Sequence, residues 1–267
     1  MRTSVKRFLP VLLVLAMPLC LRAQPGHPAR GEGADTQDNV SADRPGMSTG
    51  TDIVPRLRFQ VETGFSLLKD HDTRTWGWNN TLLRFGVLPW MELRAESNLV
   101  QEELRLNGLR QENVFGLEPF VVGTKIRIWE GEGLLPAVGL LLNVSLPLSS
   151  QAFRPDYPAP GLTFLAEQNI TDKLCIGWNL GCIYDGHVSD PVGYAALCVS
   201  YGFTGRFGAF AETNNYFQKG ASPQYLIEYG LTWHPGKNVQ LDLYSDLNAG
   251  AFRQYFGIGA GLTWLIR

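Results

Sequence analysis

Alternation of apolar and polar residues with a period of two is the feature that most constrains how this chain can fold. Near the C-terminus, for example, Val239, Leu241 and Leu243 alternate with Gln240 and Asp242. The pattern is typical of strands whose two faces meet different surroundings, and no comparable stretch repeats every 3.6 residues as an amphipathic helix does. Twelve segments carry it, at 57–68, 74–88, 91–101, 113–129, 136–147, 160–169, 174–184, 191–201, 206–217, 224–233, 238–246 and 253–267. The sequence therefore predicts an all-β fold.

The connections between these segments alternate in length. Compact turns such as 88–90 and 234–237 follow the even-numbered segments, whereas several longer polar loops follow the odd-numbered ones, the largest at 102–112 and 148–159. An even number of strands of about ten residues, with short turns at one end and longer loops at the other, is typical of outer-membrane barrels. We therefore expect a transmembrane antiparallel up-and-down β-barrel of about 12 strands over residues 56–267.

The tryptophans help to separate a membrane barrel from a soluble β-sandwich, in which strands with one solvated face would alternate equally well. Most of those placed by the pattern lie at or beside short turns or the C-terminus, and one lies near the opposite end of its strand. Transmembrane barrels carry aromatic girdles at both membrane interfaces, whereas a sandwich would hold tryptophan in its core. The membrane barrel is favoured, and the predicted interface aromatics are Trp76, Trp90, Trp129, Trp233 and Trp264.

The N-terminus predicts export. Basic residues precede an apolar run at 8–21, and a small residue, Ala23, closes it, as in a secretory signal peptide with residues 1–23 removed. A retained membrane helix is the weaker alternative, because the run is shorter than the ~20 residues that a span needs. Residues 24–55 contain almost no large apolar side chain and are predicted to be a flexible periplasmic arm.

The charge and the cysteines exclude several classes of protein. The whole chain has a formal net charge of -2, and residues 1–23 hold basic but no acidic side chains, so the exported chain is more acidic still and nucleic acid is not an expected partner. The three cysteines that remain, Cys175, Cys182 and Cys198, are an odd number and form no predictable disulfide framework. Their spacing does not resemble a zinc site, and no metal or cofactor is predicted.

Three stretches resemble a known family. They are Ala42-Asp43-Arg44-Pro45-Gly46 in the arm, Phe59-Gln60-Val61-Glu62-Thr63-Gly64-Phe65 in the first strand, and the last strand at 255–264. Over 42–267 the chain is similar to the outer-membrane transporter family named for the meta-pathway of phenol degradation. It departs in its ending, Leu265-Ile266-Arg267, where outer-membrane barrels usually finish on an aromatic residue. The resemblance implies a barrel that passes small molecules, apolar or aromatic ones among them, across the outer membrane.

If the aliphatic strand face meets lipid, the opposite face lines the lumen. By parity, the lumen-lining charged residues are Arg58, Glu62, Arg94, Glu96, Lys125, Arg127, Glu167, Glu212, Glu228 and Asp242. Two outcomes remain open: a narrow pore that mildly favours cations, or a lumen that paired side chains close. The arm could also fold back into the lumen, where Asp43 and Arg44 would find charged partners.

The main functional prediction is an outer-membrane channel or transporter that passes small molecules by passive or facilitated diffusion, without catalysis. A non-conducting structural or binding barrel is one alternative. An outer-membrane lipid hydrolase using His187 and Ser189 is another, because residues two apart share one side of a strand. The expected location is the outer membrane of a Gram-negative bacterium after Sec-type export. The expected partners are outer-membrane lipids, the barrel assembly machinery and an unidentified small solute, and the barrel is expected to be a monomer.

Overall fold

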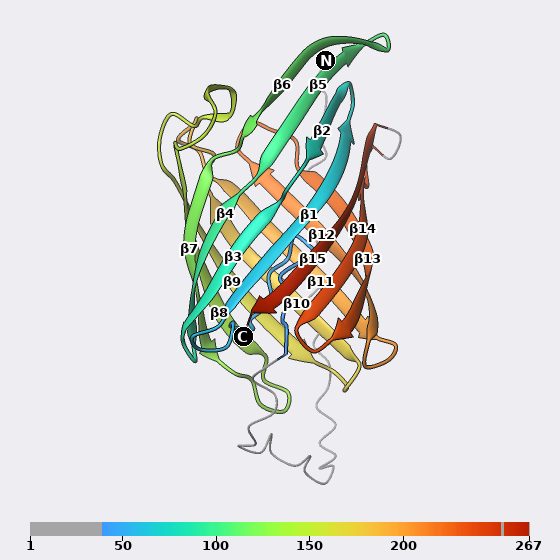
Figure 1. The fold of residues 1–267 in the computed structure, drawn as a ribbon. Helices are drawn as coiled ribbons and strands as arrows, with labels where there is room; N and C mark the ends of the chain where they lie inside the picture. Colours follow the sequence, from blue (N-terminus) through green and yellow to red (C-terminus); the bar gives the residue numbers. More distant parts are fainter. Residues whose placement is uncertain (1–38, 252–253, 267) are drawn as a thin grey trace, which may run out of the picture. The chain divides into compact units, whose positions relative to one another are not determined.

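One antiparallel sheet closes on itself to form the barrel in Figure 1. The computed structural model describes residues 39–251 and 254–266, and these residues belong to one compact unit. The sheet closes because the last segment, β15, pairs with the first, β1, from Phe59↔Ile266 to Asp70↔Tyr255. The predicted signal peptide and residues 24–38 of the predicted arm lie outside the described residues.

The sheet holds 15 strand segments, and six of them combine in pairs into three long barrel strands, so the barrel has the 12 strands that the sequence predicts. The paired segments are β2 (Thr73–Gly77) with β3 (Thr81–Leu88), β4 (Met91–Ser97) with β5 (Leu99–Leu106), and β6 (Leu109–Leu117) with β7 (Phe120–Trp129). The others are β1 (Phe59–Asp70), β8 (Ala137–Leu146), β9 (Ala159–Asn169), β10 (Leu174–Ile183), β11 (Val192–Gly202), β12 (Phe207–Gln218), β13 (Gln224–Gly236), β14 (Val239–Asn248) and β15 (Tyr255–Ile266).

One predicted loop is wrong. Most of 102–112 is strand, because β5 runs to Leu106 and β6 begins at Leu109. Asn107 and Gly108 form the tight turn between them, both with positive φ (52° and 79°), the geometry that Asn-Gly hairpin turns require. The resulting β5–β6 hairpin projects beyond the other strands at one end of the barrel (Figure 1). We call this end the loop end and the opposite one, where Ile266 lies, the short-turn end.

The two faces of the sheet invert the arrangement of a soluble protein. Large apolar side chains such as Leu180, Leu231 and Leu243 are exposed on the outside, whereas Arg84 and Lys125 are fully buried inside. A lipid-facing apolar surface around a polar interior is the arrangement expected of a transmembrane barrel. Among the described residues, the single helix is a three-residue 3₁₀ turn, η1 (Gln151–Phe153), and none is long and apolar enough to cross a membrane.

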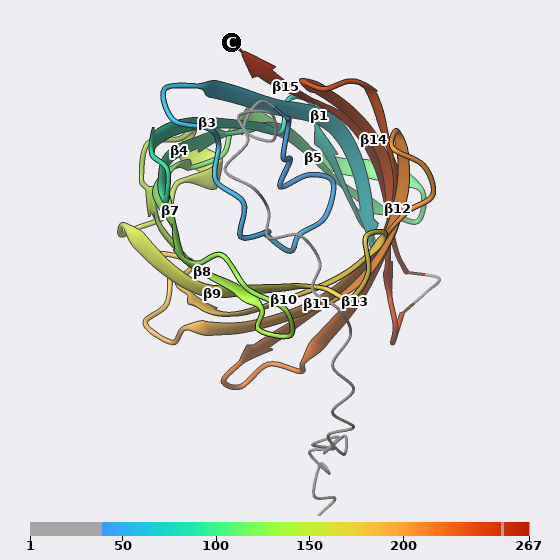
Figure 2. The same cartoon turned by 90° about the horizontal axis from the view of Figure 1, so that it is seen from below.

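Residues 39–58, which we call the arm segment, lie inside the barrel (Figure 2). The sequence composition predicts a flexible periplasmic arm over 24–55, whereas the described part of that range lies in the lumen, as in the alternative in which the arm folds back. The physical reason is that its backbone N–H groups and charged side chains find partners on the inward faces of the strands, as the next section describes.

Candidate functional site: the lumen and the arm segment

The arm segment forms a loop that enters and leaves the lumen at the short-turn end. The Val40 N–H donates to the carbonyl of Lys237 in the β13–β14 turn at 2.7 Å, and the Leu57 N–H donates to the carbonyl of Gly86 at 2.7 Å. Midway along it, the Met47 N–H donates to the carboxylate of Glu212 at 2.7 Å. Figures 1 and 2 show this path as the blue trace inside the strands. The described chain therefore occupies the lumen at the short-turn end.

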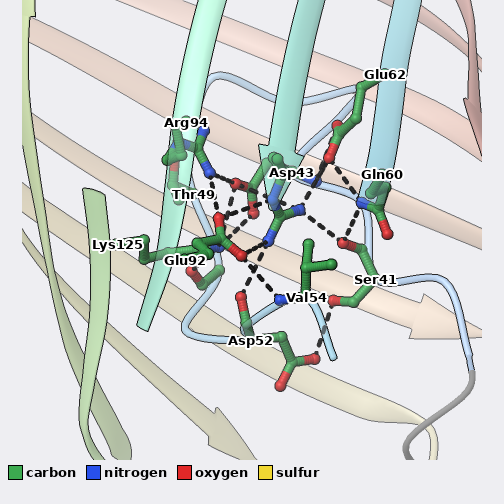
Figure 3. A network of polar contacts seen from close by, with 12 residues as sticks. Ser41, Asp43, Thr49, Asp52, Val54, Gln60, Glu62, Glu92, Arg94 and Lys125 are labelled. Carbon is green, nitrogen blue, oxygen red and sulfur yellow. Dashed lines mark hydrogen bonds and ion pairs between the residues drawn. The ribbon is translucent and has the colours of Figure 1, made fainter. Parts of the chain in front are cut away.

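Asp43 is the centre of the contacts that fix the arm segment to β3, β4 and β7 (Figure 3). Its Oδ1 lies 2.9 Å from the Lys125 ammonium and its Oδ2 lies 3.5 Å from the Arg84 guanidinium, while Arg94 also donates to Oδ2. Burial alone would raise the pKa of the Asp43 carboxyl, but the three cations outweigh burial and hold that pKa well below its ordinary value. Asp43 is therefore a buried, ionised anchor.

Two strand carboxylates complete this cluster by binding both a cation and the arm backbone. Glu62 on β1 accepts from the Arg84 guanidinium at 2.8 Å and from the Arg44 N–H at 3.1 Å. Glu92 on β4 accepts from Arg84 Nε at 2.8 Å and from the Val54 N–H at 2.8 Å. We call the six residues the anchoring network: Asp43, Glu62, Arg84, Glu92, Arg94 and Lys125.

The anchoring network is neutral in formal charge and is almost completely buried. It contains three carboxylates and three cations, and the side chains of Arg84, Glu62, Glu92 and Lys125 have no exposed area. Removing one partner of such a group leaves an uncompensated buried charge, which costs about 3–5 kcal/mol. The network therefore holds both limbs of the arm segment against one side of the barrel.

The other side of the lumen holds the arm segment mainly with carboxylates and amides, together with one ion pair. Glu167 on β9 accepts from both the N–H and the hydroxyl of Thr51 at 2.8 Å, and the Asn179 side chain accepts from the Thr49 N–H at 2.7 Å. Asp242 on β14 pairs with Arg44 at 3.2 Å. Backbone N–H groups are thus the main partners on this side.

A cavity of about 370 Å³ lies between the arm segment and β11–β14. Gly46 and Ser48 line it from the arm segment, and Ser200, Thr232 and Gln240 line it from the strands. Asp43 and Glu167 on β9 also line it, so the arm segment leaves space beside it that extends from Asp43 towards these strands.

The predicted lumen residues fall into three groups. Six of them contact the arm segment: Glu62, Arg94, Lys125, Glu167, Glu212 and Asp242. Glu228 faces the lumen and makes no hydrogen bond to the arm segment among the described residues. Arg58 is the last residue of the arm segment and directly precedes β1. Glu96 accepts from Asn98, and Arg127 binds the Pro89 carbonyl and Glu130 at the short-turn end, so neither belongs to the arm contacts.

The sequence interpretation omitted Arg84 and Glu92, two of the most buried side chains in the lumen. Glu92 shares the parity of Arg94, so the alternation in β4 contains the signal for it. Arg84 is the lone charged residue of the β3 segment Thr81–Leu88, and its own parity places it inside as well.

Four of the five predicted interface tryptophans have exposed side chains, and Trp76 is half-buried against Phe65 and Trp78. Trp90, Trp129, Trp233 and Trp264 are 42–49% exposed, and Trp233 stacks on Phe207 with a ring-centroid separation of 6.0 Å. Their depth in a bilayer remains a prediction.

The hydrolase alternative receives no geometric support. His187 lies in an exposed loop with its Nδ1 3.3 Å from the Asp156 carboxylate, and the described residues include no hydrogen bond between His187 and Ser189. The N–H groups of His187 and Val188 instead bind the Asp185 carboxylate and lower its pKa. No group of three or more metal-ligating side chains occurs in the described part of the chain, and Cys175, Cys182 and Cys198 are free thiols.

Fold and lumen together define a closed 12-stranded β-barrel of the kind seen in outer-membrane channels, with an N-terminal segment folded inside it. The family model described as "Putative MetA-pathway of phenol degradation" matches residues 42–266, and the chain belongs to this family. No curated protein sequence matches the chain.

Three solved structures share the fold. An outer membrane channel from Pseudomonas putida F1 is 8% identical, with a TM-score of 0.62 over 81% of this chain and 98% of the channel. The KdgM porin, in complex with oligogalacturonate, is 10% identical, with a TM-score of 0.53 over 78% and 99% of the two chains. The NanC porin is 11% identical, with a TM-score of 0.52 over 76% and 98%. At these identities the similarity concerns the fold alone.

Proposed function

We propose that this protein is an outer-membrane channel for small molecules, in which the arm segment narrows the lumen and has to shift for larger solutes to pass. The observation that carries the proposal is a closed barrel whose lumen contains the arm segment, held mainly by side chains of the strands. The arm segment adds no strand to the sheet, and its described ladder contact is the single bridge between Arg56 and Gly86. It can therefore leave without breaking the barrel.

The proposed solutes are small apolar or aromatic molecules that cross by passive or facilitated diffusion. The family description, which names phenol degradation, supports this class. Size supports it too, because a cavity of about 150 Å³ already holds benzene, and the space beside the arm segment is about 370 Å³. The proposal involves no catalysis.

The proposed setting follows from the export signal predicted at residues 1–23. The barrel would reach the outer membrane of a Gram-negative bacterium after Sec-type export, be inserted by the barrel assembly machinery, and stand there as a monomer among outer-membrane lipids. The short-turn end would then face the periplasm, as in other outer-membrane barrels.

A disulfide lock tests whether the arm segment controls passage. The Cys198 thiol lies beside the Ser48 side chain, and Cys198 is also the cross-strand partner of Glu212, which binds Ser48. Ser48→Cys would therefore allow a bond from the middle of the arm segment to β11. Planar-bilayer conductance and the entry of phenol into liposomes are measured before and after reduction.

We expect the oxidised Ser48→Cys protein to pass phenol more slowly than the reduced one, with recovery on reduction. The matched control carries Ser48→Cys together with Cys198→Ser and should show no redox dependence. A second variant lacks residues 24–55 and should conduct in larger steps. If this deletion leaves both conductance and phenol entry unchanged, the arm segment is not the constriction. If every variant folds but shows neither conductance nor phenol entry, the protein is a non-conducting structural or binding barrel and the channel proposal fails.

A further inference from the structure

The two sides of the lumen differ in charge. The anchoring network on β1, β3, β4 and β7 balances its charges within itself. The strands β9 and β12–β14 present five carboxylates on their inward faces: Glu167, Glu212, Glu228, Asp242 and Asp246. Among the described residues, the one cation that pairs with any of these is Arg44, on Asp242. This side of the lumen therefore carries an excess of negative charge.

Three of these carboxylates stand in a row across neighbouring strands. Glu212 on β12 is the cross-strand partner of Glu228 on β13, and Glu228 is in turn the partner of Asp246 on β14. Cross-strand neighbours have Cβ atoms about 4.5–5.5 Å apart, and like charges placed directly opposite each other are destabilising. Glu212 is satisfied by N–H groups of the arm segment. The other two acids accept no hydrogen bond from the arm segment among the described residues.

The carboxyl groups of Glu228 and Asp246 hydrogen-bond to each other, but each also has one buried oxygen that no donor in the described part of the chain reaches. Glu228 is 2% exposed, and the buried Oε1 of Glu228 and Oδ1 of Asp246 have no hydrogen-bond partner among the described residues. Two adjacent buried carboxylates cannot both stay ionised without compensation, so the pair holds either a shared proton or a cation at its unpartnered oxygens.

The surroundings of the pair suit a small cation. On the far side of Asp246 stands Gly257, and the Asp246 carboxylate occupies the place that a Cβ would take there, so the glycine makes room for the carboxylate. Two residues along β14, the Tyr244 ring already faces a cation, with the Arg44 guanidinium carbon 5.9 Å from the ring centroid. The described residues contain no group of three or more metal-ligating side chains.

The carboxylate row also lies next to the open side of the arm segment. The cavity beside the arm segment is lined by Phe210 on β12 and Thr232 on β13. Glu212 is the next inward-facing residue after Phe210, and Glu228 is the second after Thr232 in the direction of the loop end. A cation at the row would therefore stand one or two inward-facing positions beyond the residues that line this cavity.

We infer that Glu228 and Asp246 bind a compact monovalent cation, an alkali ion or the ammonium head of a small amine, and make the passage beside the arm segment cation-selective. The selectivity rests on the proposed channel function, whereas the binding does not. Rings and ladders of carboxylates produce cation selectivity in pores, and a desolvated site with two adjacent charges attracts a compact cation more strongly than a bulky one.

The selectivity is measured from the reversal potential of the exported chain in a planar bilayer under a KCl gradient. The variant Glu228→Gln with Asp246→Asn removes both charges with little change in shape. The matched control, Glu112→Gln with Asp172→Asn, removes two exposed carboxylates outside the lumen. We expect the wild-type protein and the control to favour K⁺ over Cl⁻, and the ratio of the two permeabilities to fall about tenfold in the lumen variant. Equal ratios in all three proteins would overturn the inference and indicate that the pair carries a proton.

A binding measurement separates this inference from the channel proposal. The temperature at which the folded barrel loses its faster gel mobility is compared in potassium, methylammonium and N-methylglucamine chloride of equal ionic strength. We expect the two compact cations to raise this temperature in the wild-type protein and in the control but not in the lumen variant. If the wild-type protein is silent in bilayers yet shows this protection, the channel proposal fails and the cation site stands. If the lumen variant does not fold, the single changes Glu228→Gln and Asp246→Asn are used instead. If the compact cations do not raise this temperature in the wild-type protein, the cation site is refuted.

Discussion

Replacing Asp43 with asparagine tests most directly what keeps the arm segment inside the barrel. The change keeps the size of the side chain and removes the charge that Lys125, Arg84 and Arg94 surround. Arg84 retains Glu62 and Glu92 at 2.8 Å, and Arg94 retains Glu92. Lys125 loses most, because its next carboxylate, Glu92, lies 3.8 Å away.

The expected loss therefore lies at the lower end of the range for breaking a buried pair, about 3 kcal/mol. This corresponds to roughly a hundredfold increase in the population with the arm segment released. The Val54 side chain reports on release, because it is 1% exposed in the folded protein. Val54→Cys in a background without Cys175, Cys182 and Cys198 is labelled with a maleimide reagent, and the labelling rate follows the released fraction.

The matched control is Asp52→Asn, which applies the same chemical change to the same segment. The Asp52 carboxylate is exposed and accepts from the Ser41 hydroxyl at 3.1 Å, so its loss should cost less than about 0.5 kcal/mol. The labelling rate should then rise less than about threefold. If Asp43→Asn accelerates labelling no more than Asp52→Asn in a correctly folded barrel, the anchoring network does not hold the arm segment.

Three further predictions use the same labelling assay. Gly86→Ala should raise the rate strongly, because a Cβ there would collide with the Val54 and Pro55 carbonyls, whereas the control Gly177→Ala, whose nearest contact is 3.6 Å, should not. Leu265→Ala should cost about 2–5 kcal/mol, because the fully buried Leu265 packs with Val54 beneath the arm segment; a rate within threefold of the parent would contradict this packing. The low pKa of Asp43 means that its stabilisation is fully present above the ordinary aspartate pKa and is lost only as the pH falls through the folded-state value. Rates normalised to the unfolded chain should therefore agree at about pH 7 and about pH 5, and a marked rise at the lower pH would show that another group controls release.

The fold can be predicted from the sequence because every strand of a membrane barrel has the same alternation of residues. Each strand separates a lipid-facing from an inward-facing side, so alternation alone locates all 12 strands and the parity of their charged residues. The β5–β6 hairpin was misjudged because glutamates and arginines populate both faces where the ribbon extends past the barrel. Asn107-Gly108 was the available signal, since this dipeptide favours a two-residue hairpin turn.

The lumen was harder to predict, because parity shows that a side chain points inward but not what it meets there. Composition predicts a flexible periplasmic arm at 24–55. In the structure, the backbone N–H groups of the arm segment bind the strand carboxylates. Charges at Asp43 and Arg44 predicted partners in the lumen, and both have them. Which acids would remain unpaired, as at Glu228 and Asp246, depends on the cross-strand register, which periodicity does not fix.

The two sides of the lumen play different parts in the proposed passage of solutes. A closed barrel has no free strand edge, so an inserted segment has to be held mainly by strand side chains. The positions of the charged side chains in the lumen then determine where the segment lies. Here the balanced anchoring network gathers on β1, β3, β4 and β7 and draws the arm segment to that side. The carboxylate row lies on the opposite side, along β12–β14, and the cavity extends from Asp43 towards these strands. Breaking the anchoring network should therefore enlarge the lumen, whereas neutralising the carboxylate row should change which ions pass while the arm segment stays in place.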